Sequence, residues 1–301
     1  MKLSSLSLSL LFVIVLLSTP AAAQPYAYVT NVNASDGSIT VIDTATLSVV
    51  STVRFNNTPS TPNFVAITPD GAHAYITNSY HNNVLVVDTS LALTDPGNAL
   101  VAIIPVGTFP RGIAITPDGA DVYVINEFSS NVSIIDTAQA LTNPGQAVVA
   151  KVPTPTGYPF AVAFTPDGTQ AYVTDPPLNR IYAIDTALAL TNPLKAVIPT
   201  GTVDFPFSWS PTMIAIPPNS MFGLVTLSGI AGLGFFPLPP VCESCHVGAA
   251  ALGNCFQPDG ALIGYSFGIA ISPVYSSAYV TYSNTTNTCC ASEGSPRWVS
   301  A

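Results

Sequence analysis

A short alternation of large and small side chains recurs along the chain and predicts strands. In its first copy, AYVTN at residues 27–31, aromatic or β-branched residues alternate with small ones, which is the period of a strand with two different faces. The other copies are AYITN at 74–78, VYVIN at 122–126, AYVTD at 171–175, GLVTL at 223–227 and AYVTY at 278–282. The six starts advance by 47, 48, 49, 52 and 55 residues, so a unit that grows by small insertions is repeated.

Each unit carries three more strand patterns. ITVIDT at residues 39–44 follows the first copy across a polar turn, and the two together predict a hairpin. A third strand follows, first as LSVVSTV at 47–53, and later units place inserts such as LALTDPG at 91–97 before it, which we expect to be loops on one face. The fourth strand, first FVAITPDG at 64–71, ends in a Thr-Pro-Asp-Gly sequence that suits a tight turn. Its small Ala66 suits the innermost strand of a radial array, where backbones crowd toward an axis.

An Asp-Thr pair ends the second strand and invites a catalytic interpretation. The aspartates are Asp43, Asp88, Asp136 and Asp185. Asp and Thr side chains also bond nearby backbone amides and end strands by making turns. Because the pair returns in unit after unit, we interpret it as part of the fold and predict no catalytic residue.

Four strands in a unit of roughly 48 residues fit a propeller blade, whose faces are buried against neighbouring blades. We therefore expect an all-β fold, a β-propeller of four-stranded antiparallel blades, as a single domain over residues 24–301 with a cysteine-containing insertion at about 235–256. The AYVTN, VIDT and TPDG motifs at these spacings resemble the YVTN β-propeller repeat proteins, which are secreted or cell-surface proteins. The resemblance covers residues 26–282. It implies a propeller and no fixed activity, because related propellers include surface-layer proteins, adhesion modules and domains of redox enzymes.

The sequence predicts five clear blades and a partial sixth. Its first blade begins at the AYVTN strand and lacks an innermost strand, so closure requires that strand to come from the C-terminal end of the chain. Residues 294–301 have a register like residues 107–115 and are our hypothesis for it. Six blades are expected, or seven if the chain is incomplete.

Composition and the N-terminus indicate an exported protein that does not bind nucleic acid. The chain is 48% hydrophobic and 8% charged, and its seven Lys and Arg residues are scattered, without the clustered cations that phosphates require. Residues 1–23 resemble a cleaved signal peptide, with Lys2, a short apolar run and an Ala-Ala-Ala site. A second apolar stretch, residues 221–238, contains four glycines and Pro237, so we expect strands there and no membrane span after signal removal.

The repeat breaks at residues 235–256, where the second strand of the fifth unit is not apparent. Cys242, Cys245 and His246 form a CxxCH motif, which is typical of covalent haem c attachment. Disulfides or free thiols are the alternative that we favour, since an exported chain forms disulfides and no cytochrome-like domain is apparent. Zinc held by these three residues and Cys255 is a further alternative. Candidate second haem ligands are Met213, Met221, His73 and His81.

The residues give little support to two enzyme classes, serine hydrolases and lactonase-type propellers. The chain has no GxSxG sequence and no apparent Ser/His/Asp arrangement. Lactonase-type propellers hold a metal with carboxylates in the axial channel, whereas the innermost strands here carry Ala and Ile. We therefore expect no metal site and lean away from an enzyme, with a lactonase-like hydrolase or lyase as an alternative.

Aromatic and proline residues gather in the loops that lead into the innermost strands, at residues 109–111, 158–160 and 205–209. These loops are expected to meet around one mouth of the channel and to bind a protein or cell-surface ligand there, with Arg111, Phe207 and Trp209 as anchors. The function predicted is an exported, non-catalytic binding, adhesion or surface scaffold module. A redox-accessory propeller that carries haem c is the first alternative.

Overall fold

The computed structural model describes residues 26–32, 37–55, 60–155, 157–206, 209–218, 222–229, 232–238, 248–251, 265–271 and 278–283. Within them, the strands form six antiparallel sheets that follow one another in chain order. The first sheet holds β1 (Tyr26–Asn31), β2 (Ser38–Asp43) and β3 (Ser48–Arg54). The second holds β4 (Pro62–Ile67), β5 (His73–Asn78), β6 (Asn83–Asp88) and β7 (Leu100–Pro105).

The remaining sheets repeat the order of the second. The third holds β8 (Pro110–Ile115), β9 (Asp121–Asn126), β10 (Asn131–Asp136) and β11 (Val148–Pro153). The fourth holds β12 (Val162–Phe164), β13 (Gln170–Asp175), β14 (Arg180–Asp185) and β15 (Val197–Asp204). The fifth holds β16 (Pro211–Ala215), β17 (Phe222–Leu227), β18 (Gly232–Pro237) and β19 (Gly248–Ala251), and the sixth pairs β20 (Tyr265–Ile271) with β21 (Ala278–Ser283).

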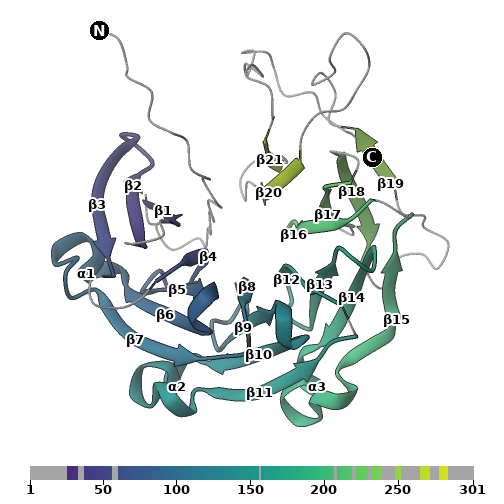
Figure 1. The fold of residues 1–301 in the computed structure, drawn as a ribbon, viewed down its shortest axis with the longest axis horizontal. Helices are drawn as coiled ribbons and strands as arrows, with labels where there is room; N and C mark the ends of the chain where they lie inside the picture. The colour runs from purple at the N-terminus through teal and green to yellow at the C-terminus, as the bar shows by residue number, and fades with distance from the viewer. Residues whose placement is uncertain are drawn as a thin grey trace, which may run out of the picture.

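Figure 1 shows these sheets arranged around an arc, each turned so that its face meets the next. The strands β4, β8, β12, β16 and β20 lie innermost, and each of the first four contacts the innermost strand of the following sheet. The fold is therefore an all-β propeller with five clear blades, as the repeat predicts. In the described residues the first blade lacks an innermost strand, as expected, while the proposed closing segment at 294–301 lies outside them.

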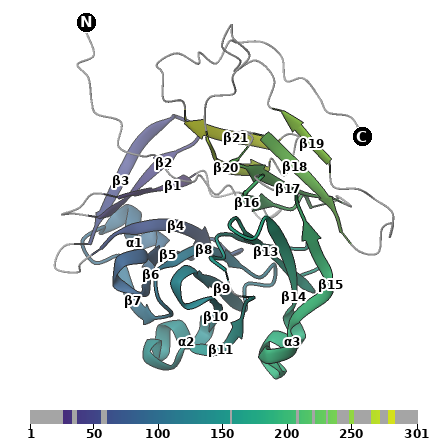
Figure 2. The same cartoon turned by 45° about the vertical axis from the view of Figure 1, so that its right-hand side comes forward.

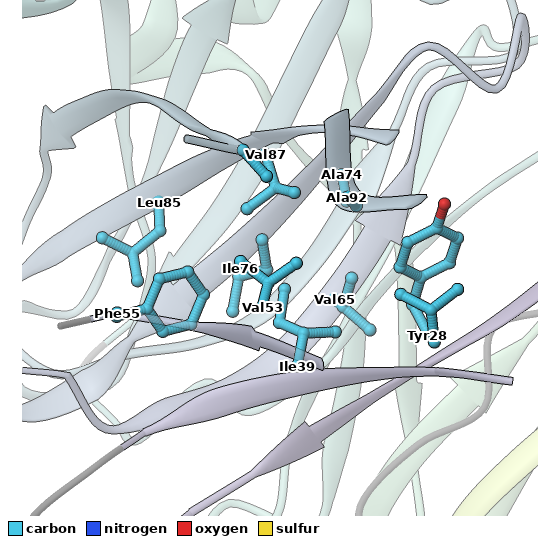
Figure 3. Close-up of a cluster of buried hydrophobic side chains, with 12 residues drawn as sticks. Tyr28, Ile39, Val53, Phe55, Val65, Ala74, Ile76, Leu85, Val87 and Ala92 are labelled. Atoms are coloured by element: carbon cyan, nitrogen blue, oxygen red, sulfur yellow. The ribbon is translucent and has the colours of Figure 1, made fainter. Parts of the chain in front are cut away.

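The hydrophobic core lies between neighbouring blades. Ala74 and Ile76 of β5 face the first blade, whereas Tyr75 between them faces the third. Figure 3 shows the core between the first and second blades, where Ile39 and Val53 meet Ile76. Because successive side chains of a strand point to opposite faces, a strand such as β5 contributes side chains to the cores on both sides of its blade. This double burial explains why the hydrophobic fraction is high.

Backbones crowd where the innermost strands meet. The Gly112 amide of β8 donates a hydrogen bond to the Phe160 carbonyl of the next blade, with 2.9 Å between nitrogen and oxygen. A Cβ atom at Gly112 would lie 2.6 Å from the Ala161 Cα, so a side chain does not fit there without movement. A residue without a side chain at this position follows from the close approach.

In the first and fourth blades, the threonine of the AYVTN motif bonds to the next blade. The Thr30 hydroxyl donates to the Asn63 carbonyl of the second blade at 2.7 Å, and the Thr174 hydroxyl donates to the Thr212 carbonyl of the fifth at 2.6 Å. Thr174 Oγ1 also accepts a hydrogen bond from the Ala161 amide of its own innermost strand at 3.1 Å. These contacts place buried polar groups of the repeat in structural roles.

The repeated aspartates begin short helices that the sequence did not predict. The inserts expected as loops contain α1 (Thr89–Thr94), α2 (Thr137–Thr142) and α3 (Thr186–Thr191), which lie along the outer rim in Figure 2. Asp88 caps α1 by accepting a hydrogen bond from the Leu91 amide at 2.8 Å, and Asp136 and Asp185 cap α2 and α3 in the same way. The structural interpretation of the Asp-Thr pair is confirmed, since N-terminal capping is a preferred role of Asp.

The Thr-Pro-Asp-Gly turn also forms as predicted. The Gly71 amide donates to the Thr68 carbonyl at 2.8 Å, and Gly71 has a φ of 75°, which glycine adopts without strain. The Thr89 hydroxyl donates to the Gly71 carbonyl at 2.6 Å. The two repeated motifs are therefore bonded to each other within one blade.

The prediction that the fifth unit lacks its second strand is wrong. β18 pairs with β17 along its whole length, and β19 pairs with β18, so this blade has four strands. Glycine and phenylalanine replace the VIDT pattern in β18, which hid the strand in the sequence. The described parts of the stretch 221–238 form β17 and β18, which are strands as expected. Among the described residues no helix has the length and apolar character needed to cross a membrane.

One repeated position differs between blades in a way that affects stability. The residue opposite the capping aspartate is His73 in the second blade, Gln170 in the fourth and Asp121 in the third, where two carboxylates face each other. Burial, and then the charges of Asp136 and Asp118, raise the pKa of Asp121 to about 6. Like charges directly opposite each other in a sheet are destabilising.

We predict that Asp121→Gln stabilises the protein at pH 7 by about 1 kcal/mol, after allowance for solvent screening of this half-buried group. The folded-state pKa lies above the unfolded value of about 4, so the wild-type protein loses stability as the pH rises from about 4 through 6. Urea unfolding at pH 4 and pH 7 measures this difference. An equal gain at both pH values would contradict the electrostatic explanation.

Candidate functional site

The predicted mouth residues occupy different environments. Arg111 lies in the innermost strand β8, and Trp209 lies just before β16. Phe207 lies outside the described residues. Trp209 packs against Phe205 with 6.3 Å between ring centroids, at the edge of the core between the fourth and fifth blades. Arg111 contacts two partly buried aromatic rings, those of Phe109 and Phe160.

Arg111 is held between two aromatic rings and a carboxylate. Its Nε donates to Glu127 Oε2 at 2.7 Å. Its guanidinium carbon lies 4.9 Å from the centroid of the Phe109 ring and 5.2 Å from that of Phe160. Cation–π contact and the ion pair together fix the side chain in one orientation. Its charge is thereby neutralised at the site.

Four aromatic rings from three blades form a continuous row beside Arg111, which we call the aromatic row. Its members are Tyr80, Phe109, Phe128 and Tyr158. The successive ring centroids are 5.1, 4.6 and 6.0 Å apart. Tyr80, Phe128 and Tyr158 are 71%, 56% and 51% exposed, and Phe109 is half-buried. Large exposed apolar surface of this kind is typical of an interaction site.

The row is supported by residues with left-handed backbone conformations. Tyr80 lies in the one-turn helix η1 (Ser79–His81) and Phe128 in η2 (Glu127–Ser129). Each of these turns ends in a residue of positive φ, Asn82 at 54° and Ser130 at 44°. The Asn82 Oδ1 accepts from the Phe109 amide at 2.9 Å, and the Ser130 hydroxyl donates to the Gly157 carbonyl at 3.0 Å. Each one-turn helix is thus hydrogen-bonded to the loop that leads into the innermost strand of the next blade.

Phe109 itself has a φ of 55°, which is rare for a bulky residue. The bond from its amide to Asn82 holds this conformation. Ser210, the corresponding residue of the fifth blade, has a φ of 47° and bonds to Asn179 in the same way. The positive φ at Phe109 therefore recurs at the same position of another blade, and at Phe109 it also orients a half-buried ring of the aromatic row.

Sequence reasoning missed half of this row. Phe109 and Tyr158 belong to the mouth loops that the sequence singled out, but Tyr80 and Phe128 lie in the turns between the first and second strands of their units, which were treated as variable and polar. The available signal was one aromatic residue at the same offset after AYITN and VYVIN. Its meaning depends on the packing of neighbouring blades, which brings the two kinds of loop together.

The comparisons with known proteins agree on the fold. A family model described as lactonase, 7-bladed β-propeller, matches residues 23–164. A solved structure of Kuenenia stuttgartiensis hydrazine synthase has a TM-score of 0.69 and 21% sequence identity, and the match covers 85% of this chain and 70% of that chain. The chain is similar in fold to both. No curated protein matches it. At 21% identity the structural likeness shows the fold alone.

The predicted haem residues Cys242, Cys245 and His246 lie outside the described residues, as does Met221. Of the other candidate haem ligands, Met213 is buried in β16. His81 lies in η1, and its Nδ1 is 3.2 Å from the Oδ1 atom of Asn78. Within the part of the chain that the structure describes, no group of three or more His, Cys, Asp and Glu residues could hold a metal ion.

Asp175 is a buried titratable residue next to the backbone of Gly157 and Tyr158, in the loop that carries the last ring of the aromatic row. It replaces the asparagine that ends the AYVTN strand in the first three blades, and its Oδ2 is buried without a hydrogen-bond partner. Burial raises the pKa of Asp175 despite hydrogen bonds from the Leu178 and Tyr158 amides. The Tyr182 hydroxyl and Thr154 Oγ1 are also buried and unpartnered in the described residues.

The same position in the third blade shows what the asparagine does. Asn126 Oδ1 accepts from the Gly107 amide at 3.0 Å, while its Nδ2 donates to Asn131 Oδ1 and to Ser133 Oγ at 2.8 and 2.9 Å. The asparagine side chain therefore accepts a hydrogen bond through its oxygen and donates two through its nitrogen. Aspartate can only accept, so the fourth blade retains an unpaired oxygen.

We predict that Asp175→Asn raises the free energy of unfolding at pH 7 by about 1 kcal/mol, because a neutral amide replaces a buried carboxylate that has one unpaired oxygen. The raised folded-state pKa means that wild-type stability is fully present below the unfolded value of about 4 and falls as the pH rises, so the gain disappears at pH 3.

The reciprocal change, Asn126→Asp, serves as the control and is expected to lower stability by about 2 kcal/mol at pH 7. Thermal and urea unfolding measure both variants. A loss of stability in Asp175→Asn would show that the carboxylate is needed for more than its place in the repeat.

Proposed function

We propose that this protein is an exported, non-catalytic β-propeller that binds a protein or cell-surface ligand through the aromatic row. The observation that carries the proposal is the exposure of three rings of the row, Tyr80, Phe128 and Tyr158, on loops of three different blades. The signal-like residues 1–23 support export.

The energetics of the row favour binding. An exposed aromatic ring gains free energy when a partner covers it, and aromatic residues are enriched at the centres of protein interfaces. The row stands on loops bonded to one another across blades, so little ordering is needed when a ligand arrives. Arg111, fixed by Glu127, gives the inner side of the row a polar group.

A lactonase-like hydrolase or lyase is the second candidate function. The match of the lactonase propeller model to residues 23–164 favours it. The described innermost strands carry mainly Ala, Ile and other uncharged residues, with Arg111 as the charged residue among them. A chromogenic lactone assay with added divalent cations tests this candidate directly.

We predict that replacing two rings, Tyr80→Ala with Phe128→Ala, weakens ligand binding at least tenfold, since an aromatic contact contributes about 1 kcal/mol beyond its buried area. The control is Leu194→Ala, because Leu194 is 80% exposed on η4 (Pro193–Lys195) and is not part of the row. Binding is measured on an array of neutral glycans, acidic glycans and peptides.

The wild-type protein and Leu194→Ala are expected to bind the same array positions, and the double variant is expected to lose them. Circular dichroism and thermal unfolding verify that all three proteins are folded. Equal binding by all three, or no binding by the wild type, would overturn the proposed function.

A further inference from the structure

We infer that the ligand of the aromatic row is a proline-rich peptide in the polyproline II conformation. This inference rests on the proposed function and specifies its ligand. It is argued from the angles between the rings, the spacing along the row, the hydroxyl groups at its two ends and its charge.

The row is not a flat platform. The Tyr80 and Phe109 rings are at 85° to each other, and the Phe128 and Tyr158 rings are at 84°. Between these two perpendicular pairs, Phe109 and Phe128 are stacked at 18°. Each perpendicular pair forms a corner, bounded by the face of one ring and the edge of the other. A compact apolar group such as a proline ring fits a corner better than it fits a flat surface.

The spacing of the two corners leaves room for one turn of a polyproline II helix between them. We take the centre of each corner as the midpoint between the two ring centroids of its perpendicular pair. The centroid distances of 5.1, 4.6 and 6.0 Å along the row then place the two corner centres at most about 10 Å apart. A polyproline II helix has three residues per turn and rises about 9 Å per turn. Prolines three positions apart on one face of such a helix would therefore occupy the two corners. Aromatic-lined grooves recognise proline-rich segments in this way.

Hydrogen-bond donors stand at both ends of the row. Tyr80 and Tyr158 are exposed and carry phenolic hydroxyl groups, which can donate. A polyproline II helix has no internal hydrogen bonds, so its carbonyl groups are available as acceptors. The ring corners thus select the proline side chains, and the hydroxyls bond the ligand backbone.

The charge at the site favours a neutral ligand. Arg111, the cation packed against the row, is paired with Glu127 and stacked on Phe109. Over the whole chain the net charge is −9. Phosphate-bearing and acidic polymers would therefore meet no unpaired cation from Arg111 and would be repelled by the overall charge. A proline-rich peptide is preorganised and needs no charge, so little ordering opposes its binding.

The test is titration calorimetry of the full-length protein with a polyproline peptide of about ten residues, which spans roughly 31 Å. A Gly-Ser peptide of equal length and a neutral cello-oligosaccharide are the comparison ligands. Saturable binding of polyproline alone is expected. Phe128→Ala should weaken it at least tenfold, Tyr158→Phe about threefold through loss of one hydroxyl, and Leu194→Ala not at all.

The outcomes separate this inference from the proposed function. Binding of the oligosaccharide in place of polyproline, lost in Phe128→Ala, would overturn the peptide ligand and leave the row as the binding surface. Polyproline binding that is unchanged in Phe128→Ala would overturn the inference as well. If no array ligand shows binding that depends on the row, both proposals fail together. Unchanged affinity of Tyr158→Phe would overturn the role given to its hydroxyl.

Discussion

Every blade of this propeller must bury both of its faces, and it can do so only against the neighbouring blades. Tyr75 and Ile76 are adjacent in β5, yet they fill the cores on opposite sides of the second blade. A strand under this constraint cannot alternate apolar and polar residues, because neither face is free for water. The chain instead alternates large and small apolar residues, which produces the AYVTN pattern and its regular return.

The same constraint determines where the polar groups go. Inner strands approach so closely that the Gly112 amide bonds to the next blade, and the threonine hydroxyls bridge successive blades at the same level. Burial of these groups is tolerated because each has a partner. Asp175 is an exception, because a carboxylate occupies the position that asparagine has in the first three blades and one of its oxygens has no hydrogen-bond partner.

Much of this frame could be predicted from the sequence because its causes are local. The hairpins, the TPDG turn and the structural role of the Asp-Thr pair all rest on residues close together in the chain. The sequence did not predict the helices after Asp88, Asp136 and Asp185, because a helix of six residues is too short to show a helical hydrophobic pattern. The aromatic row was recognised only in part, since Phe109 meets Phe128 through a turn that begins 18 residues later and meets Tyr80 across blades. Such contacts depend on tertiary packing and leave only a faint repeat in the sequence.

The central claim is that the repeated polar residues hold the frame, while rings present in three blades bind the ligand. Its most direct test measures affinity for the array-selected ligand in two folded variants, Asp88→Ala and Phe128→Ala. Asp88→Ala should lower the free energy of unfolding by about 1 kcal/mol through loss of a helix cap and leave the affinity unchanged. Phe128→Ala should reduce the affinity at least tenfold. An affinity lost in Asp88→Ala but kept in Phe128→Ala would contradict the account.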